Sequence, residues 1–522
     1  METLMEKQTA SYCLLAAAII VLSITREEAR IIKFNRVMMF KSCTHHFFLW
    51  FSVELLIIII NGQRLKQAKT PLLENKPFIA IWNAPTQQCK LRYKIDLDLS
   101  VFDIVANKNE TLSGQNVTIF YHTHLGYYPY CTDDGQSMHG GVPQNQSLKK
   151  HLDKATEDII TRLPDKDFPG LGVIDWENWR PQWDRNWGIK SIYRNKSIEL
   201  VQKHHPEWPV HLIKQKAKEE FDEAARTFMS ESVLLTQEIR SNGLWGYYLF
   251  PDCYNYDYKN KAHSYTGKCP DIEMKRNDYL QWMWKYSTAL YPSIYLDYVL
   301  KSSENAKNFV HYRLREATRV ASMSERPYDV PIYAYARPFY SLTLYTLSEI
   351  DLIHTIGESA ALGAAGIVLW GGSDYSSTPE SCKLVKNYID GPFGHYIVNV
   401  TSAAKLCSKV LCGKNGRCVR KNLNSAAYLH LNPRNFKIKS HVSGKGHYVT
   451  GHHGKEDVRY MKHRFVCQCF EGWTGMSCEL PVTEDLKWKT GTSHNGSDLS
   501  FIAFTFLFYA FFQISILLVL YT

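Results

Sequence analysis

Short apolar segments alternate with helical patterns between residues 75 and 395, and this alternation constrains the fold more than any other feature of the chain. Seven segments have the character of buried strands: Phe78–Trp82, Thr118–Tyr121, Leu171–Trp176, Leu244–Leu249, Leu290–Leu296, Val330–Tyr335 and Gly366–Trp370. Helices are predicted after the N-cap Ser147, over Lys214–Arg240 and over Leu347–Leu362. We therefore expect an α/β fold with a parallel sheet, either doubly wound or closed into a β/α barrel. Seven strands would make a barrel irregular.

Both ends of the chain carry apolar runs. The run Phe47–Ile60 has the length of a signal-peptide core, so residues 1–62 are predicted to be an upstream extension and a signal peptide; a signal anchor or a buried hairpin is the alternative. A polar spacer (481–498) precedes a hydrophobic tail (499–522) in which no basic residue follows the apolar run. This pattern favours a GPI-attachment signal over a plain transmembrane anchor. We expect the protein at the cell surface, held to the membrane through this tail.

Six Asn-x-Ser/Thr triplets agree with a secretory route: Asn109, Asn116, Asn145, Asn195, Asn399 and Asn495. The chain has 61 Lys and Arg against 51 Asp and Glu, which gives a net charge of +10. A basic protein favours acidic partners. On the secretory route, these partners are an anionic polysaccharide or membrane rather than nucleic acid.

Six cysteines are crowded between residues 400 and 480. The stretch 467–478 resembles the closing loop of an EGF-like domain, and that module implies the pairs Cys407–Cys418, Cys412–Cys467 and Cys469–Cys478. The long insertion within the module contains a basic, histidine-rich run (441–463), interpreted either as a solvated insertion or as a polyanion or metal patch. Upstream, Cys253 and Cys269 can close a local loop, and Cys89 and Cys382 can tie together the ends of the preceding domain. Cys131 is then left over, either as a free thiol or as the partner of a cysteine in another molecule.

Two carboxyl groups lie at the end of the third predicted strand. Asp175 and Glu177 are two residues apart, so both side chains of an extended segment point to one face. Such close carboxylates cannot both ionise at low cost, so we expect one raised pKa and a general acid. Other strands end in aromatic residues, whose flat faces and polar tips suit sugar rings: Tyr127–Tyr128, Tyr247–Tyr248, Tyr291 and Trp370. The combination predicts a glycoside hydrolase; the alternative is an exposed strand end with aromatic residues that only pack in the core.

Several longer segments resemble the vertebrate hyaluronidases, including the sperm-surface branch of that family. They occur in order through the predicted large domain: WNAP at 82–85, GYYPY at 126–130, GGVPQ at 140–144, VIDWENWRP at 173–181, LWGYY at 244–248, PDCYN at 251–255, ALYPS at 289–293 and GIVLWG at 366–371. The EGF-like end also matches.

The resemblance implies a distorted, TIM-like (β/α) barrel over 75–395, followed by a disulfide-rich EGF-like module over 400–480. It also implies endo-cleavage of the β-1,4 bond after N-acetylhexosamine, with retention, in which the substrate's own acetamido carbonyl is the nucleophile. Glu177 would be the proton donor. Asp175 would hold the acetamido nitrogen and raise the pKa of Glu177.

The family pattern also implies substrate contacts, at Tyr128, Tyr248, Tyr291 and Trp370, with Arg180 and Arg337 as candidates for binding uronate carboxylates. The pairs Cys89–Cys382 and Cys253–Cys269 match the family. No metal or cofactor is implied.

The predicted substrate is hyaluronan. One alternative is a hydrolase of the same family that prefers chondroitin, because Gly357–Gly366 and the Cys469–Cys478 loop resemble that branch. The other is an adhesion protein that binds hyaluronan without cleaving it. The intact pair of Asp175 and Glu177 argues against the second alternative.

Overall fold

A computed structural model describes residues 65–440 and 446–482. From Lys66 onward these residues belong to one compact unit. The predicted extension and signal peptide (1–62), most of the spacer and the whole hydrophobic tail lie outside the described residues, and so does Asn495. No helix in the described part of the chain combines the length and the apolar character that crossing a membrane requires.

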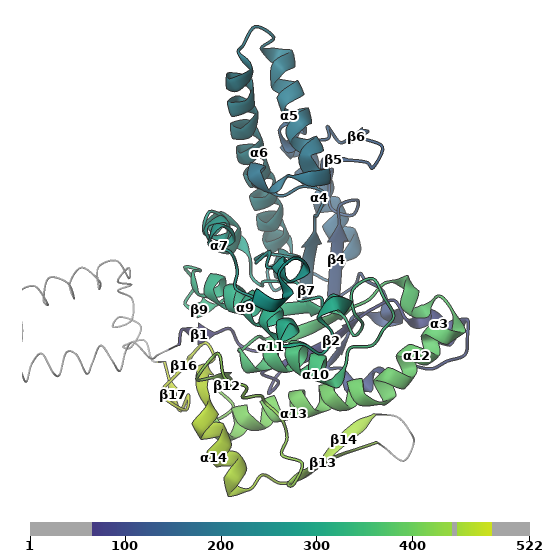
Figure 1. Ribbon diagram of the computed structural model, residues 1–522, viewed down its shortest axis with the longest axis vertical. Coiled ribbons are helices and arrows are strands. Elements are labelled where there is room, and N and C mark those ends of the chain that lie inside the picture. Colours follow the sequence, from purple (N-terminus) through teal and green to yellow (C-terminus); the bar gives the residue numbers. More distant parts are fainter. Residues whose placement is uncertain (1–64, 441–445, 483–522) are drawn as a thin grey trace, which may run out of the picture. The chain divides into compact units, whose positions relative to one another are not determined.

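Parallel strands form the centre of the large domain (Figure 1). One sheet has the order β4 (Val117–Tyr121), β7 (Leu171–Asp175) and β8 (Leu244–Tyr247). The other has the order β10 (Tyr333–Ala336), β11 (Gly366–Trp370), β2 (Ile79–Asn83) and β3 (Ile104–Val105). Isolated parallel bridges, Tyr248 to Tyr291 and Ser293 to Tyr335, connect the two sheets through residues 290–293. The α/β class and the parallel sheet are confirmed.

The strand predicted over Leu290–Leu296 is present only as these isolated bridges. Pro292 interrupts it, because proline has no N–H to donate to a strand ladder. Pro331 has the same effect on the next strand, which starts at Tyr333 rather than at the expected Val330. The segment nevertheless occupies the predicted place in the strand order.

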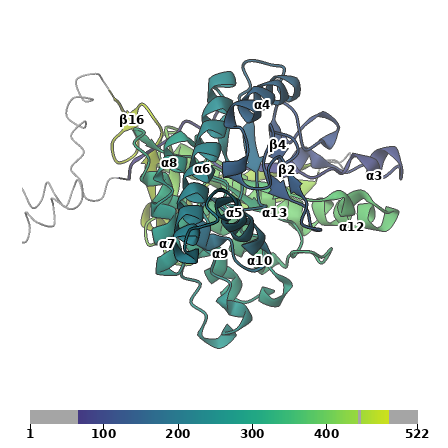
Figure 2. The same ribbon diagram turned by 90° about the horizontal axis from the view of Figure 1, so that it is seen from above.

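Both faces of the sheets are buried, and side chains alternate between two apolar clusters. Ile79 and Ile81 of β2 join an inner cluster that also contains Tyr291, whereas Ala80 and Trp82 join the cluster that packs against the helices. Burial on both faces is typical of parallel sheets covered by helices. In Figure 2, β2 and β4 lie between α4 (Leu148–Arg162) and α13 (Pro392–Leu411).

Helices follow the strands, as expected, with some differences in their bounds. Ser147 caps α4 through its side chain, and the helix predicted over Lys214–Arg240 is α6 (Val210–Ile239). The helix predicted over Leu347–Leu362 is divided into α10 (Glu349–Leu352), a π-turn (Ile353–Gly357) and α11 (Glu358–Ala361). In the described part of the chain, four helices of more than ten residues were not foreseen: α5 (Ser191–His204), α9 (Glu304–Ser322), α12 (Pro379–Asp390) and α13.

The C-terminal region begins inside α13, so the expected boundary between 395 and 400 falls within one continuous helix. Strand β12 (Gly416–Arg420) pairs with β15 (Phe465–Cys469), and the insertion between them contains the hairpin β13 (Phe436–Ser440) and β14 (His447–Gly451), followed by α14 (Lys455–Arg464). The histidine-rich run thus contributes β14 and α14, while 441–445 lies outside the described residues. Across the described ranges, no group of His, Cys, Asp and Glu is arranged to hold a metal ion.

Each of the five expected cysteine pairs is a disulfide in the structure: Cys89–Cys382, Cys253–Cys269, Cys407–Cys418, Cys412–Cys467 and Cys469–Cys478. Cys131 is a buried free thiol. Burial raises the pKa of this thiol, which makes it less reactive.

Candidate active site

Polar and aromatic side chains gather where the parallel strands end. Asp175 is the last residue of β7, Tyr121 the last of β4 and Trp370 the last of β11, and Tyr248 directly follows β8. Tyr121 and Asp175 are register partners in neighbouring strands. The carboxyl ends of parallel strands are the edge at which α/β enzymes place their chemistry.

The two carboxyl groups differ in their surroundings. The side chain of Glu177 is 51% exposed, whereas Asp175 is largely buried. Burial raises the pKa of Asp175 to about 8, the charge of Glu177 adds to the shift, and the guanidinium of Arg180 opposes it. The expected raised pKa is therefore found at Asp175. The pair thus holds a proton at neutral pH.

Aromatic packing fixes the loop that follows β7. The ring of Tyr128 lies 4.7 Å from that of Trp176 and is stacked on Trp179 at 5.2 Å, and its hydroxyl accepts a hydrogen bond from the Trp179 N–H. These three side chains are buried. Glu177 lies between Trp176 and Trp179 in the chain, and the packing of these neighbours leaves its own side chain at the surface.

Two cations lie beside Glu177. The Arg180 Nη1 donates to the Glu177 main-chain carbonyl at 3.1 Å, and Nη2 lies 3.8 Å from the Glu177 carboxylate. Asn186 holds Arg180 in place, since its side chain accepts from the Arg180 N–H and donates to the Arg180 carbonyl, both at 2.9 Å. Lys190 donates to the main-chain carbonyls of Glu177 and Asn178. Arg180 is thus where the sequence placed it, next to the acid pair.

An aromatic wall completes the site. Trp370 stacks on Tyr295, with ring centroids 6.2 Å apart and planes at 18°, and its Nε1 donates to the Tyr121 hydroxyl at 3.4 Å. Tyr248 lies 6.2 Å from Tyr295 and donates to the Ser293 hydroxyl at 3.3 Å. Burial raises the pKa values of Tyr121 and Tyr248, and the charges of Asp175 and Glu177 add to the shift, so these tyrosines and the acid pair share one environment.

Two predicted substrate contacts, Tyr291 and Tyr128, are fully buried, so a direct contact with substrate stays a prediction that this structure does not favour. Tyr291 is fully buried in the inner cluster, and its hydroxyl donates to the carbonyl of Leu244, the first residue of β8, at the opposite end of the strands from Asp175. Tyr128 is likewise fully buried and supports the loop described above. Both residues are packing residues, and the exposed neighbour of Tyr128 is Tyr127.

Arg337 is engaged by protein groups rather than free. Its guanidinium lies over the ring of Trp370 at 5.3 Å, donates to the Tyr375 hydroxyl at 3.3 Å and is 3.6 Å from the Asp374 carboxylate. These contacts support the back of Trp370. A role in binding uronate stays a prediction for Arg180 and has less support for Arg337.

Sequence reasoning missed Tyr295 and Lys190 and gave Tyr121 no role. Tyr295 lies four residues beyond Tyr291, and the interruption at Pro292 hid the point at which this irregular strand ends. Tyr121 was already the final residue of a predicted strand, so the strand-end rule applied to Asp175 would have identified it. No sequence signal marks Lys190.

Four of the five predicted glycosylation sites within the described residues are exposed, and the fifth is half-buried. Asn109, Asn116, Asn145 and Asn195 are exposed. Asn399 lies within α13, is half-buried, and accepts a hydrogen bond from the Leu431 N–H at 2.8 Å. Attachment at any of these residues stays a prediction.

The chain was compared with known proteins. Residues 67–482 match the family model described as hyaluronidase. A hyaluronidase of Echis ocellatus and hyaluronidase-1 of Cerastes cerastes are each 55% identical over 429 residues, which cover 82% of this chain and 96% of the relative.

Among solved structures, bee venom hyaluronidase is 31% identical with a TM-score of 0.55, covering 62% of this chain and 99% of the other. The same enzyme in complex with a hyaluronic acid tetramer gives a TM-score of 0.56 at 31% identity, covering 61% and 98%. The family match over most of the chain, the high identity and the shared fold agree with the acid pair and aromatic wall found here. This chain belongs to the hyaluronidase family of glycoside hydrolases.

Proposed function

We propose that this protein cleaves hyaluronan within the chain, at β-1,4 linkages and with retention, using Glu177 as the proton donor and the substrate's acetamido group as the nucleophile. The observation that carries the proposal is the pairing of an exposed carboxyl group, Glu177, with a largely buried one, Asp175, whose pKa burial raises to about 8. A pair that retains one proton at neutral pH supplies both a donor and a negative charge.

In the proposed first step, the proton that the acid pair holds passes through Glu177 to the glycosidic oxygen, so that Asp175 is ionised, and the bond from that oxygen to C1 breaks. The acetamido carbonyl oxygen bonds to C1, while Asp175 accepts a hydrogen bond from the acetamido N–H and stabilises the positive charge of the cyclic intermediate. In the second step, the Glu177 carboxylate takes a proton from water as the water oxygen attacks C1 and the ring opens. Two displacements at C1 retain its configuration.

The aromatic wall has a place in this scheme. The hydroxyls of Tyr248 and Tyr295 are hydrogen-bonded to each other, and Trp370 presents a ring beside them. We assign them to holding the acetamido group and the sugar face next to the acid pair. Tyr295 replaces Tyr291 in this role.

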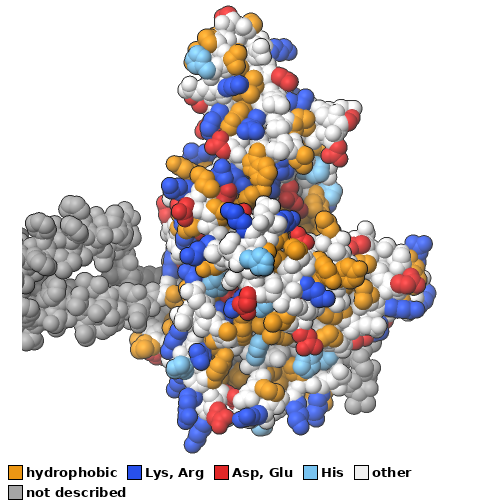
Figure 3. All heavy atoms as spheres, in the orientation of Figure 1, with side chains coloured by type: hydrophobic (Ala, Val, Ile, Leu, Met, Phe, Trp, Pro, Cys, Tyr) orange, Lys and Arg blue, Asp and Glu red, His pale blue; other side chains and the backbone are white. Residues whose placement is uncertain are grey.

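The charge of the protein supports an anionic polymer as substrate. Lys and Arg side chains are spread over the face visible in Figure 3, and the net charge of +10 favours a polyanion as substrate. The bee venom enzyme solved with a hyaluronic acid tetramer shares the fold, which supports hyaluronan as the polymer.

We also propose the finer architecture. The strand order β4-β7-β8, then 290–293, then β10-β11-β2-β3 supports a distorted β/α barrel, and the disulfides Cys407–Cys418, Cys412–Cys467 and Cys469–Cys478 support an EGF-like module with a long insertion. A cell-surface location through a C-terminal GPI anchor remains our proposal from the sequence. Release of the protein from cells by a phosphatidylinositol-specific phospholipase tests it.

The decisive experiment replaces Glu177 by Gln in the full chain. We expect cleavage of hyaluronan to fall at least about a hundredfold, the size of a general-acid contribution, while hyaluronan binding persists. Glu199→Gln, an exposed change on α5, is the matched control and should be unaffected. Unchanged turnover in Glu177→Gln rejects the mechanism; binding without turnover in the unaltered protein favours the adhesion role, and faster cleavage of unsulfated chondroitin favours the other substrate.

A further inference from the structure

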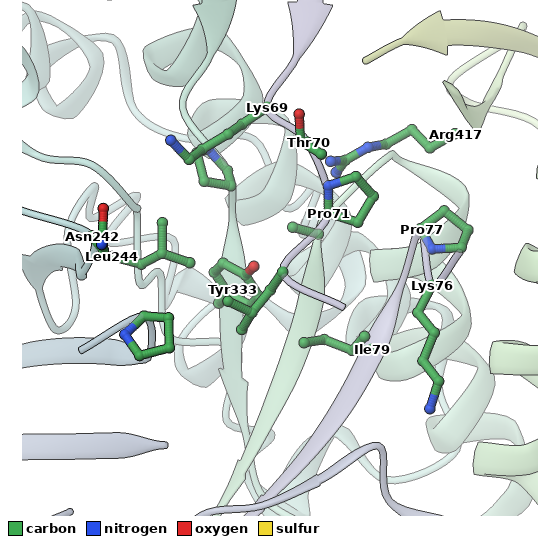
Figure 4. A pocket seen from close by; sticks show the side chains of 14 residues that line it. Lys69, Thr70, Pro71, Lys76, Pro77, Ile79, Asn242, Leu244, Tyr333 and Arg417 are labelled. Carbon is green, nitrogen blue, oxygen red and sulfur yellow. The ribbon is translucent and has the colours of Figure 1, made fainter. Parts of the chain in front are cut away.

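A cavity lies among the first residues of the parallel strands, at the opposite end of the strands from the acid pair; Figure 4 shows the side chains that line it. It has a volume of about 200 Å³, and its wall includes the first residues of three strands, Ile79, Leu244 and Tyr333. At roughly 3.3 Å per residue, a strand of this length separates it from the carboxyl ends by about 15 Å. The cavity is therefore distinct from the candidate active site.

The charged side chains that line this cavity are all cationic: Lys69, Lys76 and Arg417. Lys76 is paired with Asp103 at 2.7 Å and extends away from the other two in Figure 4. Lys69 has only a neutral partner among the described residues, the Tyr328 hydroxyl at 3.3 Å. Lys69 and Arg417 therefore carry positive charge at the cavity without a carboxylate in its wall.

Arg417 is the unusual member of this set. It lies on β12, is only 4% exposed, and reaches toward Thr70 and Pro71 in Figure 4. Its Nη1 donates to the Gly363 carbonyl at 2.8 Å, but its buried Nε has no hydrogen-bond partner in the described part of the chain. A buried cation with an unused donor is costly unless an anion or acceptor completes it.

The nearby acid does not complete it. Asp329 acts on Arg417 only over a distance, and its Oδ2 accepts from the Gln468 side chain at 2.8 Å instead. Burial lowers the pKa of Arg417 to about 10 and raises that of Asp329 to about 6, so neither charge is well compensated by the other. Apart from the Gly363 carbonyl and the ring of Phe470, 5.6 Å away, the Arg417 guanidinium thus has no close partner among the described residues, and its Nε lacks an acceptor.

We propose that this cavity binds a small oxyanion, a carboxylate or a sulfate, between Arg417 and Lys69. A guanidinium presents donors in a planar fork that matches such an anion, and the Tyr333 hydroxyl and the Asn242 amide line the same space as further donors. The cavity is far larger than the roughly 10–15 Å³ that one water needs, so a sulfate ion or the carboxylate end of a sugar acid fits. Both groups occur free and on anionic sugars.

Binding there would join three parts of the chain. Lys69 lies in the segment between β1 (Gln67–Ala68) and β2, Tyr333 begins β10, and Arg417 belongs to the C-terminal region. An anion held by all three therefore stabilises the attachment of the C-terminal region to the strands. The expected readout is thermal stability, which is independent of hyaluronan cleavage.

The test measures Tm of the full chain in sodium sulfate, sodium glucuronate and sodium chloride at equal ionic strength, with calorimetric titration of the first two. At about ten times Kd, a specific anion should raise Tm by about 1–2 °C relative to chloride. If only sulfate or only glucuronate raises Tm, that result identifies which of the two anions the cavity binds. If neither anion raises Tm relative to chloride, the proposal is overturned.

Matched variants separate binding from a general salt effect. Lys69→Met, at the partly exposed wall, should fold normally, keep its activity and bind the anion at least about tenfold more weakly, and Arg417→Met should abolish binding. Arg459→Met, an exposed change on α14, should behave as the unaltered protein. Equal shifts in Lys69→Met and Arg459→Met overturn the proposal, and this comparison does not depend on whether Arg417→Met folds.

Discussion

The ammonium group of Lys190 donates a hydrogen bond to the main-chain carbonyl of Glu177 and another, at 3.0 Å, to the adjacent carbonyl of Asn178. Lys190 directly precedes α5, so these bonds fasten the loop that carries the proposed proton donor to the start of a helix. Burial lowers the pKa of Lys190 to about 8, and the neighbouring Arg180 adds to the shift. The loop is thus positioned by a cation that is partly removed from water.

Replacing Lys190 by Met should lower kcat and leave KM nearly unchanged, because the change frees the loop but removes no proposed substrate contact. A displacement of about 1 Å at a reacting group costs up to roughly a hundredfold in rate, so we expect a loss of about ten- to a hundredfold. Lys190→Arg should recover part of the rate, since it also donates. Steady-state kinetics on hyaluronan measure this, with the exposed Lys203→Met as control; a normal kcat in Lys190→Met contradicts the positioning role.

The pH dependence of cleavage should have an alkaline limb near pH 8. Below the pKa of Asp175, about 8, the acid pair holds the proton that the leaving oxygen requires; above it, both carboxyl groups are ionised and no donor remains. We expect kcat/KM to fall about tenfold per pH unit beyond the limb. Lys190 titrates in the same range, but Lys190→Arg removes that titration and should keep the limb. Asp175→Asn should move it, and a limb that follows Lys190 instead refutes the assignment.

Asp175→Asn should also change stability in a pH-dependent way. The folded-state pKa is raised from 3.8 to about 8, so the folded protein binds the proton more tightly than the unfolded chain. This contribution to stability is fully present below about pH 4 and is lost as the pH rises through about 8. Asn cannot ionise, so the variant should have the higher Tm at pH 7.5 and little advantage at pH 4. An equal difference in Tm at both pH values contradicts the linkage.

Two tyrosines on one segment should respond oppositely to loss of the hydroxyl. Tyr291→Phe removes a buried hydrogen bond to Leu244 and should cost about 1 kcal/mol of stability without changing kcat/KM. Tyr295→Phe keeps the ring that stacks on Trp370 and removes the hydroxyl bonded to Tyr248, so it should lower kcat/KM about tenfold and leave Tm nearly unchanged. Thermal unfolding and kinetics on the same preparations decide between the two residues, and the reverse pattern restores Tyr291 to the site.

Tyr291 and Tyr295 illustrate what could not be predicted from the sequence. The α/β class, the strand over Gly366–Trp370 and the capping of α4 by Ser147 follow from local patterns that the tertiary structure does not override. An end of an irregular strand depends on pairing across the sheet, and Pro292 disrupts the pattern that would reveal it. Local sequence therefore located the segment but not its functional side chain.

The same limit applies to the acid pair, because the sequence predicted the pair but not the surroundings of each carboxyl group. Spacing alone brought Asp175 and Glu177 together, but which of them is buried depends on the packing of Tyr128, Trp176 and Trp179, which come from two distant segments. The predicted boundary between 395 and 400 falls inside α13 for a different reason. Pro392 in the first turn of α13 is an ordinary helix-start signal, whereas the cysteine-rich segment begins only at Cys407, near the end of the same helix.

A fully buried ion pair connects the large domain with the C-terminal region. Arg420 of β12 and Glu358 of α11 are joined by two hydrogen bonds of 2.9 and 2.8 Å, and both side chains are fully buried. His311 of α9 contributes a third bond, 2.7 Å, to the same carboxylate. These bonds hold the pKa of Glu358 below its ordinary value despite burial.

Arg420→Met should destabilise the protein by about 3–5 kcal/mol, because it leaves the Glu358 charge buried without its guanidinium partner. The double change of Arg420→Met and Glu358→Gln should recover part of that loss, since no unpaired charge then remains. Chemical unfolding of the four combinations measures the coupling, with the exposed Arg459→Met as control. Because a depressed carboxyl pKa stabilises the fold above the unfolded value of about 4.3, the unaltered protein should lose this advantage as the pH falls below it, whereas the double variant should not. Additive losses in the double variant contradict a coupled pair and assign the cost of Arg420→Met to packing alone.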